Sequence, residues 1–205
     1  MATPLIISAD QYKKYFPKYN PNKAEEFHQL SAQLVDKHFA AAIQYIPTST
    51  IILSGGTASG KTEYLKEYLL HFGQNGGIFL DGTLPSFEGA NIKIKNLIKY
   101  NREFEIHFIY PENLLKSYEI FLSRERKFNS SHFYRTHSNS RKTLLEISQK
   151  YPNIKIRIIQ SKFLKQEKIM HFTKQNFHNS QTLIDFLQKL QITEKNLKQK
   201  IYDKN

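Results

Sequence analysis

The chain has 205 residues, of which 40% are hydrophobic and 23% are charged, as in an ordinary globular protein. This length is enough for one α/β domain with a sizeable core. The absence of cysteine excludes a disulfide framework, a thiolate nucleophile and a cysteine-based metal site.

The start of the sequence, residues 1–7, lacks the basic lead-in of a signal peptide, and no apolar run is long enough to cross a bilayer. We therefore expect a cytoplasmic protein that does not contact a membrane. The 30 basic and 18 acidic residues give a formal net charge of +12, which attracts polyanions. The basic residues gather in residues 116–142 and after residue 161, without the basic–aromatic alternation of a single-strand binding groove. Anionic small molecules are therefore favoured over nucleic acid, and an acidic protein partner is the alternative.

In chain order, the first predicted element is a short apolar strand at residues 5–7, which is followed closely by Asp10. Ligands of a parallel sheet bind outside the carboxyl ends of its strands, so Asp10 is expected to face a site. The alternative is that Asp10 caps a helix. Residues 21–46 predict one long amphipathic helix, because apolar residues recur in it at steps of three and four.

The strongest signal follows an apolar, β-branched run at residues 50–53 and precedes a helical pattern at residues 63–70. It is the G-x-x-x-x-G-K-T sequence Gly55, Gly56, Thr57, Ala58, Ser59, Gly60, Lys61 and Thr62. A strand, this sequence and a helix in succession are typical of a phosphate-binding P-loop, in which glycines let backbone N–H groups surround an anion. Lys61 is expected to reach the outer phosphates of ATP, and the Thr62 hydroxyl is expected to hold Mg²⁺. A glycine-rich turn that carries Lys-Thr by chance is the alternative.

A second buried strand, residues 76–83, ends in Asp81, Gly82 and Thr83. The pattern then predicts a helix at residues 86–100, an alternating strand with one polar face at 103–110, and a helix that Pro111 opens and residues 124–127 end. Residues 128–140 are expected to form an exposed loop or lid with Arg135 at its tip. A helix at residues 141–151, a last strand at 154–159 and a lysine-rich helical tail from Gln166 complete the prediction.

Several of these segments resemble the zeta toxin family of P-loop kinases, the toxic halves of bacterial epsilon/zeta toxin–antitoxin pairs. The stretch from Asp10 to Tyr19 is similar to the family pattern D-x-F-K-x-x-x-P-x-F, and Asp81-Gly82-Thr83 is similar to its E/D-G-T strand end. Ser117-Tyr118 with Arg124 resembles the arginine of the family's lid helix. The resemblance spans residues 5–160. In the family the P-loop comes first, whereas here Asp10 precedes it, so the early elements are expected in a permuted order.

The resemblance implies a three-layer, P-loop kinase-like α/β fold with a mainly parallel sheet and helices on both faces. We expect one such domain over residues 1–160. Residues 161–205 are expected to form a basic helical extension that packs on this domain or on a partner.

The resemblance also implies an ATP- and Mg²⁺-dependent phosphotransferase that phosphorylates a hydroxyl of a UDP-N-acetylated amino sugar, such as UDP-N-acetylglucosamine, and so blocks cell-wall synthesis. Asp10 would accept the hydroxyl proton, and Arg124 and Arg135 would close over the transferring group. Arg126 and Arg141 are the alternatives to Arg135. Asp81 and Thr83 would orient the acceptor, and an antitoxin protein would be the partner.

Two other functions remain open from the sequence. A kinase of the same build can act on another acceptor, such as a nucleotide, NAD or a polynucleotide 5′-hydroxyl. Alternatively, the chain is a nucleotide-binding interaction protein that keeps the P-loop and does not catalyse transfer.

Overall fold

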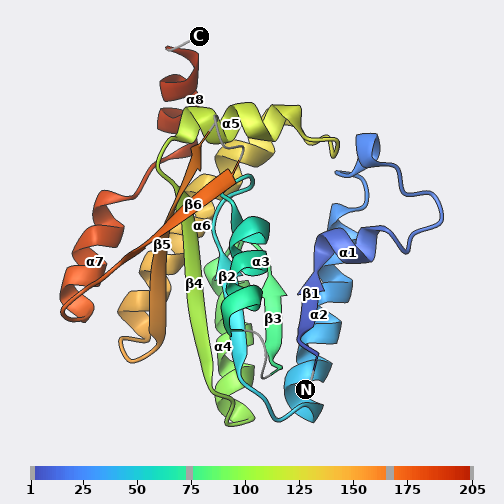
Figure 1. The fold of residues 1–205 in the computed structure, drawn as a ribbon, viewed down its shortest axis with the longest axis vertical. Coiled ribbons are helices and arrows are strands. Elements are labelled where there is room, and N and C mark those ends of the chain that lie inside the picture. The colour runs from blue at the N-terminus through green and yellow to red at the C-terminus, as the bar shows by residue number, and fades with distance from the viewer. Residues whose placement is uncertain (1–2, 73–75, 165–168, 204–205) are drawn as a thin grey trace.

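The computed structural model describes residues 3–72, 76–164 and 169–203. Within these residues a single six-stranded sheet has the order β1-β3-β2-β4-β5-β6 (Figure 1). All neighbouring strands are parallel except β6, which runs antiparallel to β5. The strands are β1 Leu5–Ser8, β2 Thr50–Ser54, β3 Ile78–Asp81, β4 Phe104–Pro111, β5 Lys155–Leu164 and β6 Ile169–Gln175. The expected α/β fold with a mainly parallel sheet is confirmed.

Helices pack on both faces of this sheet. They are α1 Ala9–Lys13, the 3-10 turn Pro21–Lys23, α2 His28–Tyr45, α3 Lys61–Phe72, α4 Phe87–Lys99, α5 Leu114–Ser123, α6 Ser130–Lys150, α7 Ser180–Lys189 and α8 Glu194–Tyr202. Ile52 packs in a core cluster with residues of α2, α4, α6 and α7, while the next residue, Leu53, packs in a second cluster with residues of α3. This alternation is the two-residue period of a strand that is covered on both faces.

The polar ends of β1, β2 and β3 lie together although β1 is far from β2 in the sequence. β1 pairs with β3, with Ser8 opposite Asp81, and β3 pairs with β2, with Leu53 opposite Asp81. Because these three strands are parallel and in this register, their carboxyl ends lie at the same edge of the sheet. Asp10, the glycine-rich loop and Asp81 therefore all lie at this edge of the sheet.

Two predicted segments differ from the structure. The helix expected over residues 21–46 begins only at His28, because Asn20 caps a separate 3-10 turn and residues 24–27 form turns. The loop or lid expected over residues 128–140 is wrong, because Asn129 caps the long helix α6 there. Its buried side chains include His132, Thr136 and Ser140 as well as apolar residues, so polar residues hide the helical pattern from a count of apolar ones.

The end of the chain also differs from the prediction. Gln166, the expected start of a helical tail, lies outside the described residues, and the next described element is the strand β6 rather than a helix. The strand expected at residues 154–159 extends to Leu164 and is followed by β6 in the same sheet. Helices α7 and α8 then pack on the domain, where Leu187 joins the main core and Leu197 joins a cluster with α5 and α6. Among the described residues, no helix has both the length and the apolar character needed to cross a membrane.

The strand expected at residues 103–110 is β4, and its polar face is covered by other parts of the protein. β4 lies between β2 and β5, and its residues 106–111 are buried. His107, the polar residue of this stretch, is fully buried and hydrogen-bonded. A strand in the middle of a parallel sheet is covered on both faces, so a polar residue there needs partners inside the protein.

Candidate functional site

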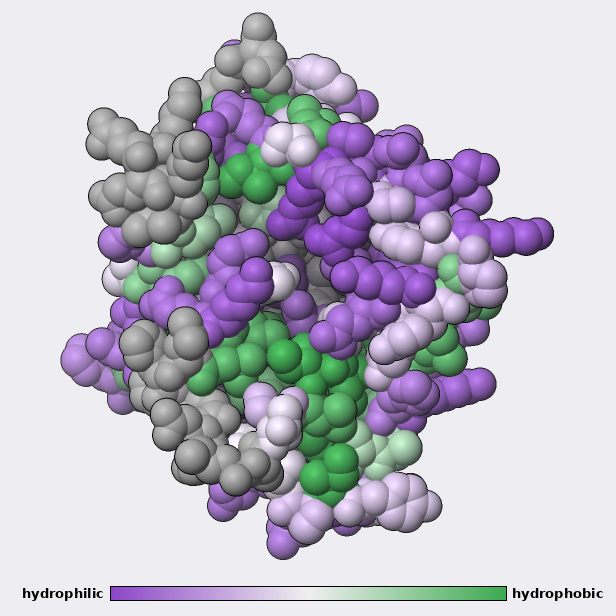
Figure 2. Space-filling view, turned by 45° about the vertical axis from the view of Figure 1, so that its right-hand side comes forward, coloured by the Kyte–Doolittle hydropathy of each residue, from purple (hydrophilic) through white to green (hydrophobic). Residues whose placement is uncertain are grey.

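A cavity of about 280 Å³ lies at the shared edge of β1, β2 and β3. Its walls include most of the residues that the sequence singled out, and these are Asp10, Thr57, Ala58, Ser59, Gly60, Lys61, Thr62, Asp81, Gly82, Thr83 and Arg124. Figure 2 turns the α1 side of Figure 1 forward and shows a hollow bordered mainly by hydrophilic residues. The structure therefore brings together residues from β1–α1, the loop after β2, the end of β3 and the end of α5.

The glycine-rich loop adopts a conformation that its glycines make possible. Gly55 has φ +134° and Gly60 has φ +88°, values that residues with a side chain rarely adopt. A Cβ atom on Gly55 would lie 2.1 Å from the carbonyl oxygen of Ile109, and one on Gly56 would lie 2.3 Å from the His137 ring. Helix α3 begins at Lys61, so its N-terminus adjoins the loop. Loop and helix together form the backbone arrangement that binds phosphate groups.

Lys61 folds back over this loop. Its ammonium donates hydrogen bonds to the carbonyl oxygens of Gly55, at 2.9 Å, and Gly56, at 2.8 Å. Burial lowers the pKa of Lys61 to about 8, and the nearby Asp81 carboxylate opposes this shift. Burial likewise raises the pKa of Asp81 and lowers the pKa of Arg124. The charged groups of the cavity are thus partly desolvated, and a bound anion would stabilise the charged forms of Lys61 and Arg124.

Thr62 and Asp81 present two oxygen atoms side by side. The Thr62 hydroxyl donates to the Asp81 carboxylate, with Oγ1 and Oδ2 3.4 Å apart. Oxygen atoms are the ligands that Mg²⁺ prefers, and protein sites for Mg²⁺ often supply one or two of them beside water and phosphate. No group of three or more His, Cys, Asp or Glu side chains that could hold a metal occurs in the described part of the chain. The two residues therefore suit Mg²⁺ that arrives with a phosphate ligand.

Asp10 lies in the first turn of α1, but it is not the residue that caps this helix. The cap is Ser8, whose hydroxyl accepts a hydrogen bond from the backbone N–H of Gln11 at 3.2 Å. The alternative that Asp10 is a helix cap is therefore wrong. Its carboxylate is half-exposed, lines the cavity, and forms ion pairs with Arg126 and with the buried Lys13, the latter at 3.3 Å.

The four arginines considered as lid residues lie in different places. Arg124 and Arg126 follow α5 and line the cavity. Arg135 is exposed on α6 and is not among the described residues that line it. Arg141 is buried on the same helix and donates hydrogen bonds to His137. Of the candidates for a second arginine, the structure brings only Arg126 to the cavity.

Sequence reasoning missed an aromatic and basic group at the wall of the cavity. The ring of Phe128 stacks on His132 with centroids 4.4 Å apart, and His132 in turn meets the ring of His28. The ammonium of Lys13 lies 4.7 Å from the Phe128 centroid, and burial lowers its pKa to about 8. The sequence offered one signal for Lys13, its place three residues after Asp10 in the D-x-F-K-like stretch. Nothing in the sequence indicates that Lys13 lies near Phe128 or His132.

The cavity also extends between α2 and α4. There its walls are mostly small and apolar, with Ala32 and Val35 from α2 facing Gly89 and Ala90 from α4. An ion pair between Asp36 and Lys93, 2.7 Å apart, joins the two helices at the wall of this part. A molecule that lies beside Asp10 and Asp81 therefore has further room away from the loop.

A second cavity, of about 360 Å³, lies on another side of the loop. Ala58 lines both cavities. The other walls of the second one come from the start of α5, from β5 and from β6, and they include Asn113, Lys116, Phe163 and Met170. An elongated ligand that is anchored at the loop can thus occupy both sides of it.

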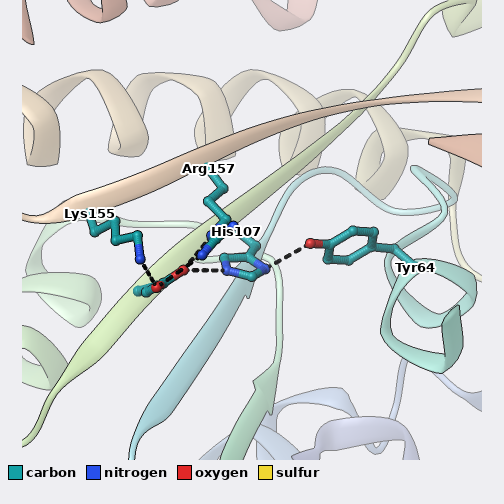
Figure 3. Close-up of polar contacts among 5 residues, drawn as sticks. Tyr64, His107, Lys155 and Arg157 are labelled. Atoms are coloured by element: carbon teal, nitrogen blue, oxygen red, sulfur yellow. Dashed lines mark hydrogen bonds and ion pairs between the residues drawn. The ribbon is translucent and has the colours of Figure 1, made fainter. Parts of the chain in front are cut away.

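A second group of polar side chains lies away from both cavities, between α3 and the sheet (Figure 3). The Tyr64 hydroxyl donates to Nδ1 of His107 at 3.0 Å, and Nε2 of His107 donates to Glu105 at 3.1 Å. Arg157 and Lys155 form ion pairs with the same carboxylate. Burial alone would raise the pKa of Glu105, but these hydrogen bonds lower it to about 2. We refer to these five residues as the Glu105 network.

A comparison with protein-family models found no match to this chain, and neither did a comparison with curated proteins. The function of the chain is therefore inferred from the geometry and chemistry of the first cavity.

Proposed function

We propose that the chain is an ATP-dependent phosphotransferase whose acceptor is a hydroxyl group. The observation that carries this proposal is that Asp10 lines the same cavity as the P-loop and Asp81, although a helix and a strand separate it from the loop in the sequence. Phosphoryl transfer to a hydroxyl depends on positioning and charge neutralisation, which the P-loop would supply. A carboxylate beside the loop can accept the proton of the hydroxyl.

The loop and its neighbours would bind the nucleotide. Loop N–H groups and the Lys61 ammonium would hold the outer phosphates of ATP. Thr62 and Asp81 would hold Mg²⁺, which supplies charge neutralisation at the phosphate oxygens when it is bound. The cavity beyond Ala58 offers room for the nucleoside part of the same molecule.

Asp10 would accept the proton of the acceptor hydroxyl as the new bond from oxygen to the γ-phosphorus forms. The bond from that phosphorus to the bridging oxygen breaks, and ADP leaves. Arg124 and Arg126 line the cavity from the segment after α5 and would neutralise the charge on the transferring group. Arg135 would contribute only if its helix moved, because it is exposed outside the cavity.

The resemblance to zeta toxins favours a UDP-N-acetylated amino sugar as the acceptor, with Asp81 and Thr83 orienting it. The extension of the cavity between α2 and α4 supports an acceptor larger than a simple alcohol. With such a substrate the activity would block cell-wall synthesis, and an antitoxin protein would be needed to restrain it. A nucleotide, NAD or a polynucleotide 5′-hydroxyl is the second candidate class of acceptor.

The test offers labelled ATP and Mg²⁺ with UDP-N-acetylglucosamine, NAD or a 5′-hydroxyl oligonucleotide. Transfer to the sugar nucleotide is the expected result. Transfer only to NAD or to the oligonucleotide would keep the kinase and replace its acceptor, and no transfer to any acceptor despite ATP binding would favour the non-catalytic alternative.

Expression in bacteria tests the toxin part of the proposal. Wild-type protein should arrest growth, and Lys61→Ala and Asp10→Asn should each relieve the arrest. Lys95→Ala and Asp185→Asn, which change exposed residues of α4 and α7, are the matched controls and should arrest growth like the wild type. Equal arrest by all five proteins would show that catalysis is not the cause.

A further inference from the structure

Three successive carbonyl groups of the P-loop are each held by a side chain from a different element. The carbonyl oxygen of Thr57 accepts from Nε2 of His137 on α6, at 2.8 Å. The carbonyl oxygen of Ala58 accepts from the Ser117 hydroxyl on α5, at 2.9 Å. The carbonyl oxygen of Ser59 accepts from the Ser161 hydroxyl on β5, at 2.7 Å. All three donor residues are buried.

These contacts determine where the amide groups of the loop point. In a planar trans peptide unit the C=O of one residue and the N–H of the next point in opposite directions. Carbonyl oxygens held toward α6 and β5 therefore direct the N–H groups of Ala58 and Gly60 to the opposite side, while the N–H of Ser59 donates to the carbonyl oxygen of Gly56 at 3.3 Å. A phosphate group binds to N–H groups that converge in this way.

The contact at Ala58 also acts against backbone strain. Ala58 has φ +57°, in the left-handed region that residues other than glycine disfavour. A conformation of this kind persists only where surrounding contacts hold it. Here the Ser117 hydroxyl holds the carbonyl of the strained residue itself.

Both ring nitrogens of His137 have hydrogen-bond partners, and these fix its tautomer. Nη1 of Arg141 lies 3.1 Å from Nδ1, which therefore acts as the acceptor and leaves the proton on Nε2, where it meets the carbonyl of Thr57. Burial, followed by the nearby Arg141 charge, holds the pKa of His137 well below its usual value, so the ring is neutral. The ring also lies where a Cβ atom of Gly56 would be.

We propose that Ser117, His137 and Ser161 are positioning residues that hold the P-loop amides ready for a phosphate group before any nucleotide binds. This inference rests on the proposed function, because it assumes that the loop binds phosphate. It adds residues that no part of the P-loop sequence motif contains. Preorganised amides would bind phosphate without first losing conformational freedom.

The serines allow the cleanest test. Ser117→Ala and Ser161→Ala each remove one donor to the loop, and the double variant removes both. Ser148→Ala is the matched control, because its buried hydroxyl donates at 2.8 Å to the carbonyl of Leu145 within α6, away from the loop. The measurements are the Kd of Mg·ATP and hydrogen exchange of the amides of residues 56–61 in the nucleotide-free protein.

We expect each loop-serine variant to weaken Mg·ATP binding by about threefold to tenfold, the fold-change that one hydrogen bond supports. Hydrogen exchange at residues 56–61 should become faster in the same variants. Ser148→Ala should leave both measurements at the wild-type values, even if its melting temperature falls as much as theirs. Equal effects of all three substitutions would overturn the proposal, because the serines would then serve stability alone.

His137 provides a second test through rescue. His137→Leu keeps the bulk of the side chain but removes both the donor and the acceptor. His137→Gln can still donate to Thr57 and accept from Arg141. Exchange at residues 56–61 should be fast in the leucine variant and close to wild type in the glutamine variant, and failure of this rescue in a folded protein would count against positioning by His137.

Failure of this inference is distinguishable from failure of the proposed function. If the wild-type protein does not bind Mg·ATP, the proposed function is wrong, while hydrogen exchange still decides whether the three side chains hold the loop. If the wild type binds Mg·ATP and neither affinity nor exchange responds to the substitutions, the positioning role is wrong and the proposed function stands.

Discussion

The first cavity, which we call the loop cavity, and the Glu105 network are two polar clusters that differ in how their charges are balanced. In the network one carboxylate is shared by Arg157, Lys155 and His107, and none of these residues lines either of the two cavities described above. In the loop cavity, Asp36 and Lys93 form an ion pair with each other. The other charged lining residues are four cations and two carboxylates, and these are Lys13, Lys61, Arg124, Arg126, Asp10 and Asp81.

This difference separates a site from a structural brace. The pKa values of both clusters are perturbed, so a perturbed pKa alone does not identify a site. A closed group in which both cations pair with one carboxylate stabilises the packing of α3 on the sheet, whereas an open cavity lined by more cations than carboxylates is prepared for an anion. Substitutions in the two clusters should therefore have opposite effects on activity and on stability.

The largest expected effect is that of Lys61→Ala, which should reduce the proposed phosphoryl transfer by about a thousandfold or more, because in that proposal the ammonium holds the outer phosphates. Transfer from labelled ATP measures the loss, and circular dichroism checks that the variant is folded. Lys155→Ala removes a lysine of the network and is the control. A Lys155→Ala protein as inactive as Lys61→Ala would erase the distinction between the clusters.

The effects of the arginines should depend on whether they line the cavity. Arg124→Ala and Arg126→Ala are each expected to reduce transfer by about a hundredfold to a thousandfold, because both line the cavity. Arg135→Ala should change transfer by less than about threefold, as expected for an exposed residue outside the cavity. Single-turnover rates with saturating ATP measure all three. A large loss in Arg135→Ala would instead support the motion of α6 that its lid role requires.

Glu105→Gln should show the reverse pattern. The substitution leaves Arg157 and Lys155 without their carboxylate. Because these cations are partly exposed, we expect the free energy of unfolding to fall by about 1–2 kcal/mol. Transfer by the folded protein at low temperature should remain that of the wild type. Denaturant unfolding and the transfer assay, performed on the same sample, give both values. Activity lost in proportion to Lys61→Ala would place Glu105 in the site after all.

A smaller effect should appear in the pH dependence of stability. Burial lowers the pKa of His107 to about 4, although its hydrogen bond to Glu105 opposes this, whereas an unfolded histidine has a pKa near 6.5. Between these values the unfolded state binds one more proton than the folded state. The contribution of neutral His107 to the free energy of unfolding is therefore fully present above pH 6.5 and is lost as the pH falls toward 4. The contribution of His107 is about 2 kcal/mol between pH 7 and pH 5.

Unfolding measured across this range in wild type and in His107→Gln checks the prediction. The glutamine does not titrate, so the variant should lose less stability than the wild type over the same interval. Parallel curves for the two proteins would mean that His107 does not titrate as its burial requires.

Much of the cavity could be predicted because its signals are local in the sequence. The glycines and Lys61-Thr62 form one continuous motif between a strand and a helix, and Asp10 and Asp81 each end an apolar run. Parallel strands place such ends at one edge whatever their order along the chain. This rule is why Asp10 lies at the cavity although β3 separates β1 from β2 in the sheet.

Other features could not be predicted, because they depend on contacts between distant segments. α6 was expected to begin as a loop because His132, Thr136 and Ser140 are polar, yet the other elements bury all three. The strand β6 needs β5 beside it to exist, so its own sequence indicated only a basic tail.

The sequence by itself determined the α/β class and the position of the glycine-rich loop between a strand and a helix, since hydrophobic period and glycine placement act over a few neighbouring residues. Only the tertiary structure decided that Arg126 rather than Arg135 lines the cavity, and that Ser117, His137 and Ser161 hold the loop. The physical reason is that a hydrogen bond or an ion pair depends on separations of a few ångströms, which packing sets and residue type alone does not.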